Sequence, residues 1–217
     1  MDYGKLMATA AQRAYNPIHA RMGECVGKYA GQFRLLDNGC KRLVTLIAET
    51  CHETTRYTQW EEQLSYTPER LVEVWPTRYS TNGKTTGKPN ARARSVAGNP
   101  QALAINTYGL RMGNLDAAHD TDTSPDGWQY RGRGPTMLTG RSAYAAMATV
   151  TGLDLVNHPE LAADPYAGML IAMWFYQQRG VFTATSDEDE RRAVQGGLLG
   201  LKDVQAIKRR VRAALAG

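Results

Sequence analysis

Apolar residues recur along most of this chain with the spacing of an α-helix. Between Cys40 and His52 they return every three or four positions, as they do on one buried helix face. Residues 67–75 (TPERLVEVW) predict a second helix, with Thr67 as its N-cap and Pro76 as its end. Capping residues before apolar runs, and glycines after or within them, predict further helices at 99–109, 141–152, 164–180 and 187–216, the last broken near Gly196 and Gly197.

A few segments interrupt this pattern. Residues 80–98 carry almost no large apolar side chains and predict a long mobile loop. Residues 120–135 form a second irregular stretch, rich in Gly and Asp. Near the N-terminus, Pro17 is expected to end any helix that reaches it. Strand signals are sparse and allow at most a short β-hairpin around residues 54–66, so the chain is predicted to be mainly α.

The length of 217 residues suits one domain, or one domain with two lobes, over residues 1–217. Hydrophobic residues make up 42% of the chain and charged residues 22%, values that are ordinary for a folded domain. The longest apolar run, residues 169–176, is far shorter than the ~20 residues that a membrane span needs. The first residues lack the apolar region of a signal peptide, so the chain is expected to stay in the cytoplasm unless another factor releases it.

The charge balance is basic, with a formal net charge of +5 and a sequence pI near 9.1. Nucleic acid, an anionic membrane surface and an anionic polysaccharide are all compatible partners. The absence of a basic segment interleaved with aromatic residues argues against nucleic acid. The cysteines and histidines match no common metal-ligand spacing, so no metal is expected. The basic residues are scattered apart from one C-terminal cluster: Lys202, Lys208, Arg209, Arg210 and Arg212.

Two acidic residues flank a segment that is poor helix material. Glu53 lies at the end of the segment predicted to be helical, and Glu62 follows nine residues later. On one continuous helix they would be ~13.5 Å apart along the axis and on opposite faces. The intervening TTRYTQW favours extended backbone, so the chain can turn back and let the two carboxylates face each other across a cleft.

A gap of about 6.5–9.5 Å between two carboxyl groups leaves room for a water and specifies inversion at a sugar carbon. The carboxyl with more apolar neighbours would keep its proton and act as the acid, and the more solvated one would act as the base. Exposure on the surface is the alternative explanation for both residues. Physical reasoning alone also does not separate Glu61 from Glu62.

The sequence around these residues, 50–66, resembles the catalytic segment of glycoside hydrolase family 19, which includes plant-type chitinases and chitinase-like bacteriophage endolysins. TCHETTRYTQWEEQLSY (50–66) carries its His-Glu-Ser/Thr motif and the E-x-L-x-Y phrase of the endolysin branch. Further segments match the family in the same order, and together they span roughly residues 40 to 201: YGLRMGN (108–114), DGWQYRGRGPTMLTGRSAY (126–144), HPELAADPYAG (158–168) and RRAVQGGLLGL (191–201).

The resemblance implies a mainly α, two-lobed, lysozyme-like fold with a central cleft. It implies that Glu53 is the general acid, that Glu62 is the carboxylate on the base side, and that Thr139 helps to hold the attacking water. A hydroxyl both donates and accepts hydrogen bonds, which suits a water held against a carboxylate. The alternative for Thr139 is an N-cap for the helix that begins at Arg141, and the two roles are compatible.

Other residues are candidates for contact with the sugar chain. Tyr66 and Tyr130 can flank a sugar with the apolar faces of their rings, although core packing is the alternative for both. Arg131 can contact substrate, with an internal ion pair as its alternative. Gln195 stands where the family carries the Asn of its I-N-G-G phrase and completes the set predicted to bind substrate.

Some positions are expected to have structural roles or depart from the family. Arg133 lies in a Gly-flanked loop and is expected to pair with a carboxylate, and His52 is expected to pack or to hydrogen-bond locally. Met137 stands where the chitinases have a sugar-contacting Gln, and Leu199 and Val204 replace residues that are often polar in relatives. These departures put chitin binding in doubt more than they affect the two carboxylates, and they favour peptidoglycan.

The sequence therefore predicts a bacteriophage-type endolysin that hydrolyses glycosidic bonds of bacterial peptidoglycan by an inverting acid/base mechanism, for host lysis. It is expected to be a monomer without metal or organic cofactor and without a separate wall-binding module. It would accumulate in the host bacterial cytoplasm and reach the periplasm and cell wall at lysis through a membrane pore-former. An anionic outer-membrane surface is a further expected partner. A chitinase acting on chitin, a non-catalytic wall-binding or virion structural protein and, more weakly, a nucleic-acid-binding protein are the alternatives.

Overall fold

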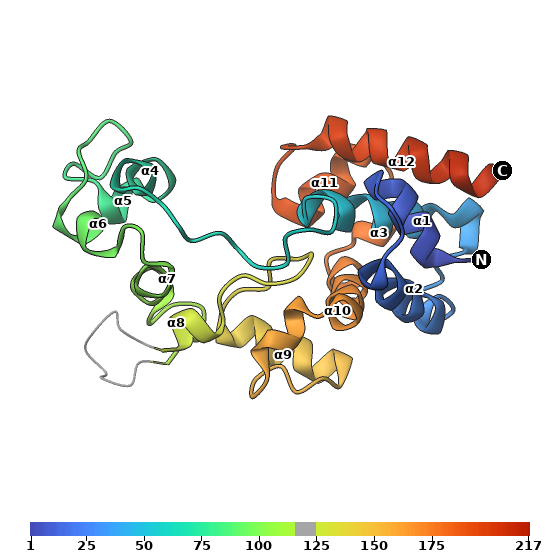
Figure 1. Cartoon of the computed structure of the whole chain (residues 1–217), viewed down its shortest axis with the longest axis horizontal. Coiled ribbons are helices and arrows are strands. Elements are labelled where there is room, and N and C mark those ends of the chain that lie inside the picture. Colours follow the sequence, from blue (N-terminus) through green and yellow to red (C-terminus); the bar gives the residue numbers. More distant parts are fainter. Residues whose placement is uncertain (116–124) are drawn as a thin grey trace. The chain divides into compact units, whose positions relative to one another are not determined.

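A computed structural model of the chain describes residues 1–115 and 125–217 (Figure 1). These residues contain no named strand; their β-type pairing is limited to isolated bridges between Glu61 and Arg133, Ser80 and Pro89, and Arg133 and Leu138. The prediction of a mainly α protein is confirmed. The helices are α1 (Tyr3–Ala11), α2 (Pro17–Tyr29), α3 (Asp37–Glu53), α4 (Pro68–Val74), α5 (Pro76–Tyr79), α6 (Ala91–Val96), α7 (Pro100–Tyr108), α8 (Asp126–Gln129), α9 (Arg141–Thr151), α10 (Pro165–Gln178), α11 (Asp187–Gln195) and α12 (Leu201–Ala216), with short 3₁₀ helices at Pro159–Ala163 and Val181–Thr183.

The described residues divide into two compact units. Unit 1 comprises Met1–Glu61, Gly132–Leu138 and Tyr144–Gly217, and unit 2 comprises Glu62–Arg131 and Thr139–Ala143. The boundary between them at residues 61 and 62 falls between two adjacent glutamates, so each of these neighbours belongs to a different unit. Within the described ranges, no helix combines the length and the hydrophobicity that crossing a bilayer requires.

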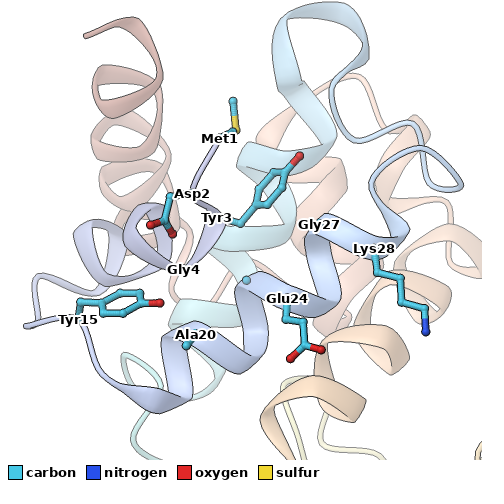
Figure 2. A pocket seen from close by; sticks show the side chains of 10 residues that line it. Met1, Asp2, Tyr3, Gly4, Tyr15, Ala20, Glu24, Gly27 and Lys28 are labelled. Carbon is cyan, nitrogen blue, oxygen red and sulfur yellow. The ribbon is translucent and has the colours of Figure 1, made fainter.

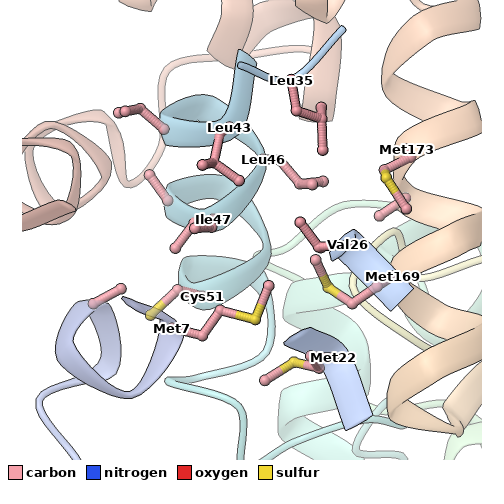
Figure 3. Packing of buried hydrophobic residues seen from close by; sticks show 14 of the residues in the cluster. Met7, Met22, Val26, Leu35, Leu43, Leu46, Ile47, Cys51, Met169 and Met173 are labelled. Atoms are coloured by element: carbon pink, nitrogen blue, oxygen red, sulfur yellow. The ribbon is translucent and has the colours of Figure 1, made fainter. Parts of the chain in front are cut away.

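The core of unit 1 is built on the apolar stripe of α3 (Figure 3). Leu43, Leu46 and Ile47 are fully buried, as the spacing of apolar residues predicts. Side chains from α1, α2 and α10 meet this stripe, among them Met22 and Met169. Burying one side chain of this size stabilises the fold by about 1.5–3 kcal/mol, so this stripe holds α3 in the core of unit 1.

Unit 2 has a smaller core of its own, which includes Leu71 from α4, Tyr79 from α5 and Leu103 from α7. Its helices begin where capping residues predict. The Thr67 hydroxyl accepts a hydrogen bond from the Arg70 amide at 3.2 Å, and the Asn99 side chain accepts one from the Ala102 amide at 3.0 Å. Each cap satisfies an amide that has no partner inside its helix.

The predicted helices at 141–152 and 164–180 correspond to α9 and α10, and both are followed by a glycine with positive φ, Gly152 and Gly180. The predicted tail helix is α11 followed by α12. The break lies where expected, because Gly196 takes the left-handed conformation that ends α11.

The short hairpin that the sequence allowed around residues 54–66 does not form. Residues 54–58 form tight turns instead, and Thr55, Arg56 and Tyr57 all have positive φ, between 49° and 62°. The turn is stabilised by Thr54, whose hydroxyl accepts a hydrogen bond from the Tyr57 amide and donates one to the Thr50 carbonyl. Burial of Tyr57 in the unit 1 core outweighs the preference of these residues for extended backbone.

The expectation of an irregular loop over residues 80–98 was wrong in part. Ala91–Val96 is α6, its N-cap is Asn90, and Val96 packs into the unit 2 core, so tertiary packing supports a helix that lacks large apolar residues. Within residues 120–135, the segment Asp126–Gln129 is helical, and residues 120–124 lie outside the described ranges. Pro17 begins α2 rather than ending a helix, because the first position of a helix needs no amide hydrogen.

One histidine of unit 1 is buried without a hydrogen-bond partner. His19 on α2 is 1% exposed, and neither of its ring nitrogens is paired within the described part of the chain. Its ring is stacked with Tyr15 at a centroid distance of 6.3 Å and meets Tyr57 edge-on at 5.9 Å. Burial, assisted by the positive charge of Arg13, lowers the pKa of His19 below its ordinary value of 6.5.

The lowered pKa of His19 predicts a loss of stability in acid. As the pH falls below about 6.5, the unfolded chain binds a proton at His19 that the folded chain does not, so the free energy of unfolding decreases. We expect the stability of the wild-type chain to fall relative to that of His19→Phe between pH 7.5 and pH 5, as measured by urea unfolding. The matched variant is His158→Gln, whose side chain is 62% exposed and which should run parallel to the wild type. Parallel curves for all three chains would contradict the prediction.

Candidate active site

The first predicted carboxylate, Glu53, is the last residue of α3, and an arginine from another helix holds it. The Glu53 side chain is 21% exposed, and its Oε1 accepts a hydrogen bond from Arg191 Nη1 at 2.5 Å. Arg191 comes from α11 and is 3% exposed. A short charge-assisted contact with a buried guanidinium restricts where the Glu53 carboxylate can point.

The same Arg191 nitrogen contacts a second carboxylate one helical turn earlier. Glu49 is fully buried, and its Oε2 lies 2.7 Å from Arg191 Nη1, while its Oε1 has no partner within the described residues. Burial raises the pKa of Glu49; Arg191 opposes this effect and the Glu53 carboxylate adds to it. Two carboxylates on one guanidinium make a cluster that becomes neutral when it binds one proton.

A tyrosine completes this cluster inside unit 1. Tyr176 from α10 is fully buried, and its hydroxyl has no partner within the described ranges. Its pKa is raised well above the ordinary value, first by burial and then by the negative charges of Glu49 and Glu53. The hydroxyl therefore stays protonated.

The guanidinium of Arg191 also donates a hydrogen bond to the backbone that follows α11. Arg191 Nε donates to the carbonyl of Leu199 at 2.7 Å, and Gln195 Nε2 donates to the same oxygen at 3.2 Å. Gln195, predicted to bind substrate, is thus brought close to Arg191 and to the Glu53 end of α3. Its side-chain amide is exposed, so a contact with substrate stays a prediction.

His52 forms the local hydrogen bond that was expected. Its Nδ1 lies 2.7 Å from Asp203 Oδ2 on α12, and the other oxygen of Asp203 accepts from Arg56 at 2.7 Å. Gly200 approaches so closely that a Cβ there would lie 2.2 Å from His52 Nε2, and its φ of 80° also favours glycine. The glycine thus allows α12 to begin against the end of α3.

The second predicted carboxylate, Glu62, lies in unit 2. Its Oε2 accepts a hydrogen bond from the hydroxyl of Tyr108 at 2.7 Å. The pKa of Tyr108 is raised, first by burial and then by the Glu62 charge, so the hydroxyl is a lasting donor. Tyr66 is half-buried near this pair, and its ring meets Trp75 edge-on at 5.5 Å. Packing is therefore part of its role, and contact with a sugar stays a prediction.

Glu61 and Glu62 have different partners. Glu61 Oε1 lies 3.4 Å from Arg133 Nε, and the two residues also form a backbone bridge within unit 1. Arg133 is 5% exposed and donates to the Tyr144 hydroxyl at 3.1 Å, so its expected structural pairing with a carboxylate is confirmed. Glu61 therefore has a structural partner in unit 1, and the choice of Glu62 as the base stays a prediction.

The other predicted residues lie in unit 2. Tyr130 is 1% exposed, and the Cζ of Arg141 lies 5.4 Å from the centre of the Tyr130 ring. This burial agrees with core packing, the alternative to sugar contact. Arg131 is stacked on Trp128, with its Cζ 3.9 Å from the ring centre, and donates to the Trp128 carbonyl. Thr139 precedes α9 and is partly exposed.

The N-cap alternative for Thr139 can be compared with the partners of the first α9 amides. The Arg141 amide donates to Asn114 Oδ1 at 2.8 Å, the Ser142 amide to the Met112 carbonyl, and the Ala143 amide to the Gly140 carbonyl. The start of α9 is thus satisfied by other groups. The role of Thr139 with water stays a prediction. Because Glu53 belongs to unit 1 and Glu62 to unit 2, the predicted cleft and the distance between the two carboxylates also stay predictions.

Sequence reasoning missed the groups that hold the two carboxylates. Glu49, Arg191 and Tyr108 were not singled out. An acidic residue inside the apolar stripe of α3 was a visible signal for Glu49, since a buried carboxylate needs a charged partner. Tyr108 and Arg191 each begin a segment that matches the family, YGLRMGN and RRAVQGGLLGL, but nothing in these segments indicated which carboxylate each residue would contact.

A groove of about 490 Å³ lies between α1 and α2 in unit 1 (Figure 2). Tyr3 and Tyr15 lie on its walls, and Gly4 and Gly23 allow the two helices to approach closely. None of the predicted site residues lines it. Within the described ranges, no group of three His, Cys, Asp or Glu residues is arranged to hold a metal ion.

Comparisons with known proteins support the resemblance seen in the sequence, although no family model matches the chain. A glycosyl hydrolase family 19 domain-containing protein of Haemophilus influenzae is 26% identical over 205 residues, which cover 94% of this chain and 90% of that protein. Chitinase 11 of Oryza sativa subsp. japonica is 39% identical over 103 residues, which are 42% of this chain and 39% of the rice protein. The crystal structure of chitinase C from Streptomyces griseus matches 99% of this chain and 92% of its own, with a TM-score of 0.58 and 13% sequence identity.

This chain has the mainly α fold of family 19 chitinases and is similar over nearly its whole length to a family 19 glycosyl hydrolase domain-containing protein. The structural match establishes the mainly α fold, and the sequence match over nearly the whole chain suggests a glycosidase. Glu53 is the residue predicted to be the general acid, and the Arg191 cluster is its immediate environment.

The Arg191 cluster predicts that the free energy of unfolding depends strongly on the pairing of Arg191 with Glu49. Arg191→Met should lower the free energy of unfolding by about 3–5 kcal/mol, because it leaves the buried Glu49 carboxylate without its counter-charge. Adding Glu49→Met should recover part of this loss, and a double-mutant cycle by urea unfolding measures the coupling. Arg192→Met, on the adjacent exposed position of α11, is the control and should change stability by less than about 0.5 kcal/mol. Additive effects of the two buried substitutions would contradict the cluster.

Proposed function

We propose that this chain is a family 19 glycoside hydrolase and that it hydrolyses glycosidic bonds in the glycan strands of bacterial peptidoglycan by an inverting acid/base mechanism. The observation that carries the proposal is the pair of differently supported glutamates. Glu53 is fixed against a buried guanidinium at the end of α3, and Glu62 is hydrogen-bonded to Tyr108 in unit 2. A protein that only binds a wall has no need of both carboxylates.

The proposed chemistry needs one proton donor and one water activator. Glu53 protonates the leaving glycosidic oxygen, with Arg191 and Glu49 as its immediate neighbours. Glu62 accepts a proton from the attacking water while Thr139 helps to position that water. After the bond breaks, Glu53 is ionised and lies beside Arg191, which stabilises the new charge.

The proposed biological role is that of a bacteriophage endolysin. In this role the protein accumulates in the host cytoplasm and reaches the cell wall at lysis through a membrane pore-former. Peptidoglycan is its proposed partner, and the net charge of +5 favours association with an anionic wall or outer-membrane surface. The apolar residues Met137, Leu199 and Val204, at positions that the family often fills with polar side chains, support a substrate other than chitin.

A chitinase is the second candidate, because the relatives include chitinase 11 of rice and chitinase C of Streptomyces griseus. The two functions share the acid and the base and differ in substrate. Purified peptidoglycan and colloidal chitin therefore separate them.

The assignment of the two glutamates predicts a specific pattern of activity. Glu53→Gln and Glu62→Gln should each lower the rate of clearing of purified cell walls by about 10²–10⁴-fold, because each removes one proton-transfer step. Glu61→Gln is the matched control, since glutamine still offers an oxygen to Arg133, and it should stay within about threefold of the wild type. Equal losses for Glu61→Gln and Glu62→Gln would contradict the assignment of the base, and full activity of Glu53→Gln would remove the proposal of hydrolysis.

The substrate proposal predicts which polymer is cut. The wild-type chain should release soluble saccharides from purified peptidoglycan and should release at least about tenfold less from colloidal chitin at the same mass of polymer. Mass spectrometry of the products identifies the reducing-end sugar and so the bond that is cleaved. Products from chitin alone would replace the proposal with the chitinase.

A further inference from the structure

Two adjoining hollows lie in unit 1 at the opposite end of α3 from Glu53. Their volumes are about 360 and 350 Å³, which lie within the range of pockets for small ligands. Both are lined by Arg34, Arg42, Phe182 and Thr183. Residues 42 and 53 are separated by about 16 Å of regular helix, so these hollows are distinct from the Arg191 cluster.

Arg42 is the side chain around which the hollows are built. Its Nη1 donates to the carbonyl of Phe33 at 3.0 Å, and its Cζ lies 5.8 Å from the centre of the Phe182 ring. Both partners are neutral. No carboxylate pairs with Arg42 within the described ranges, and its other guanidinium nitrogens have no acceptor there. A positive charge is therefore held in place without an opposite charge.

The cations beside Arg42 are already matched. Arg34 Nε lies 2.6 Å from Asp37 Oδ2, and this pair is exposed. Lys41 Nζ donates to the Ala184 carbonyl at 2.6 Å and lies 3.5 Å from the buried carboxylate of Glu190. The charge that stays open to a ligand is that of Arg42.

The C-terminal basic cluster contributes less open charge than its sequence indicates. Lys208 is 1% exposed and pairs with Asp187 at 2.7 Å and with Glu190. Arg210 donates to the carbonyl of Ala10. Two of the five cations in this cluster therefore have partners inside unit 1. Arg42 is the better candidate for binding an anion.

The remaining lining residues suit a sugar. Thr183, Thr185, Gln32 and Gln177 are exposed and offer hydroxyl and amide groups, and Phe182 offers an apolar ring edge. We propose that the two hollows form a binding site for an anionic saccharide unit, whose phosphate or carboxylate group is bound by Arg42. The guanidinium would bind two oxygens of the anion through its unused N–H groups. This site requires no hydrolysis, so it stands or falls separately from the proposed function.

The test is a titration of the full chain carrying Glu53→Gln, followed by NMR of the arginine Nε–Hε groups and the backbone amides. The probes are inorganic phosphate, glucosamine 6-phosphate, N-acetylmuramic acid and, as the neutral comparison, N-acetylglucosamine. We expect saturable shifts at Arg42, Thr183 and Ala184 with an anionic sugar, and binding by N-acetylglucosamine at least about tenfold weaker. Whether the phosphate or the carboxylate sugar binds more tightly identifies the source of the anion.

Substitutions connect the binding to the arginine. Arg42→Gln and Arg42→Lys should each weaken binding of the anionic sugar about tenfold, the lysine because it loses the two-pronged geometry. Arg34→Gln is the second variant, for use if Arg42→Gln proves unstable. The Arg34 side chain lines both hollows and is 69% exposed, so this variant should fold normally and should weaken binding a few-fold. Arg179→Gln is the control, because Arg179 is also exposed, lies 5.0 Å from the Phe175 ring and lines neither hollow.

The result that overturns the proposal is equally direct. Absence of saturable shifts with every probe, binding of N-acetylglucosamine as tight as that of both glucosamine 6-phosphate and N-acetylmuramic acid, or equal losses for Arg42→Gln and Arg179→Gln would each remove the site. Loss of wall hydrolysis in Glu53→Gln together with intact binding would leave both the site and the proposed function in place.

Discussion

The buried guanidinium of Arg191 is the charge on which the end of α3 depends. It brings together Glu49 and Glu53 from one face of α3, the carbonyl of Leu199, and the helix α11 that carries it. A fully buried carboxylate such as Glu49 is tolerated only with a charged partner, and that partner then also fixes Glu53. The position of the predicted acid is thus a consequence of how unit 1 satisfies a buried charge.

The two neighbouring glutamates at the boundary of the units have different surroundings despite being the same residue type. Glu61 pairs with a buried arginine of unit 1, and Glu62 accepts a hydrogen bond from a buried tyrosine of unit 2. Their chemistry is identical, and only their partners differ. The boundary of the units passes between them, so each unit supplies one of the two carboxylates proposed to act on the sugar.

Much of the fold could be predicted because the local signals agree with the packing. The apolar stripe of α3 and the caps at Thr67 and Asn99 placed helices correctly. The failures occur where tertiary contacts decide: a run of left-handed residues that buries Tyr57, and α6, whose burial of Val96 outweighs a polar composition. The family resemblance indicated Glu53 and Glu62, but their supporting residues lie far away in the sequence, and nothing in the sequence paired them with these two carboxylates.

The proposed chemistry requires that one carboxylate donates a proton while the other activates a water on the opposite face of the sugar. The most direct test is proton NMR of the first reducing ends that wild-type protein releases from a soluble β-linked fragment of its substrate, recorded before mutarotation. The account predicts that the α anomer forms first, because a single displacement inverts the configuration. Initial formation of the β anomer would show retention and would contradict the roles given to Glu53 and Glu62.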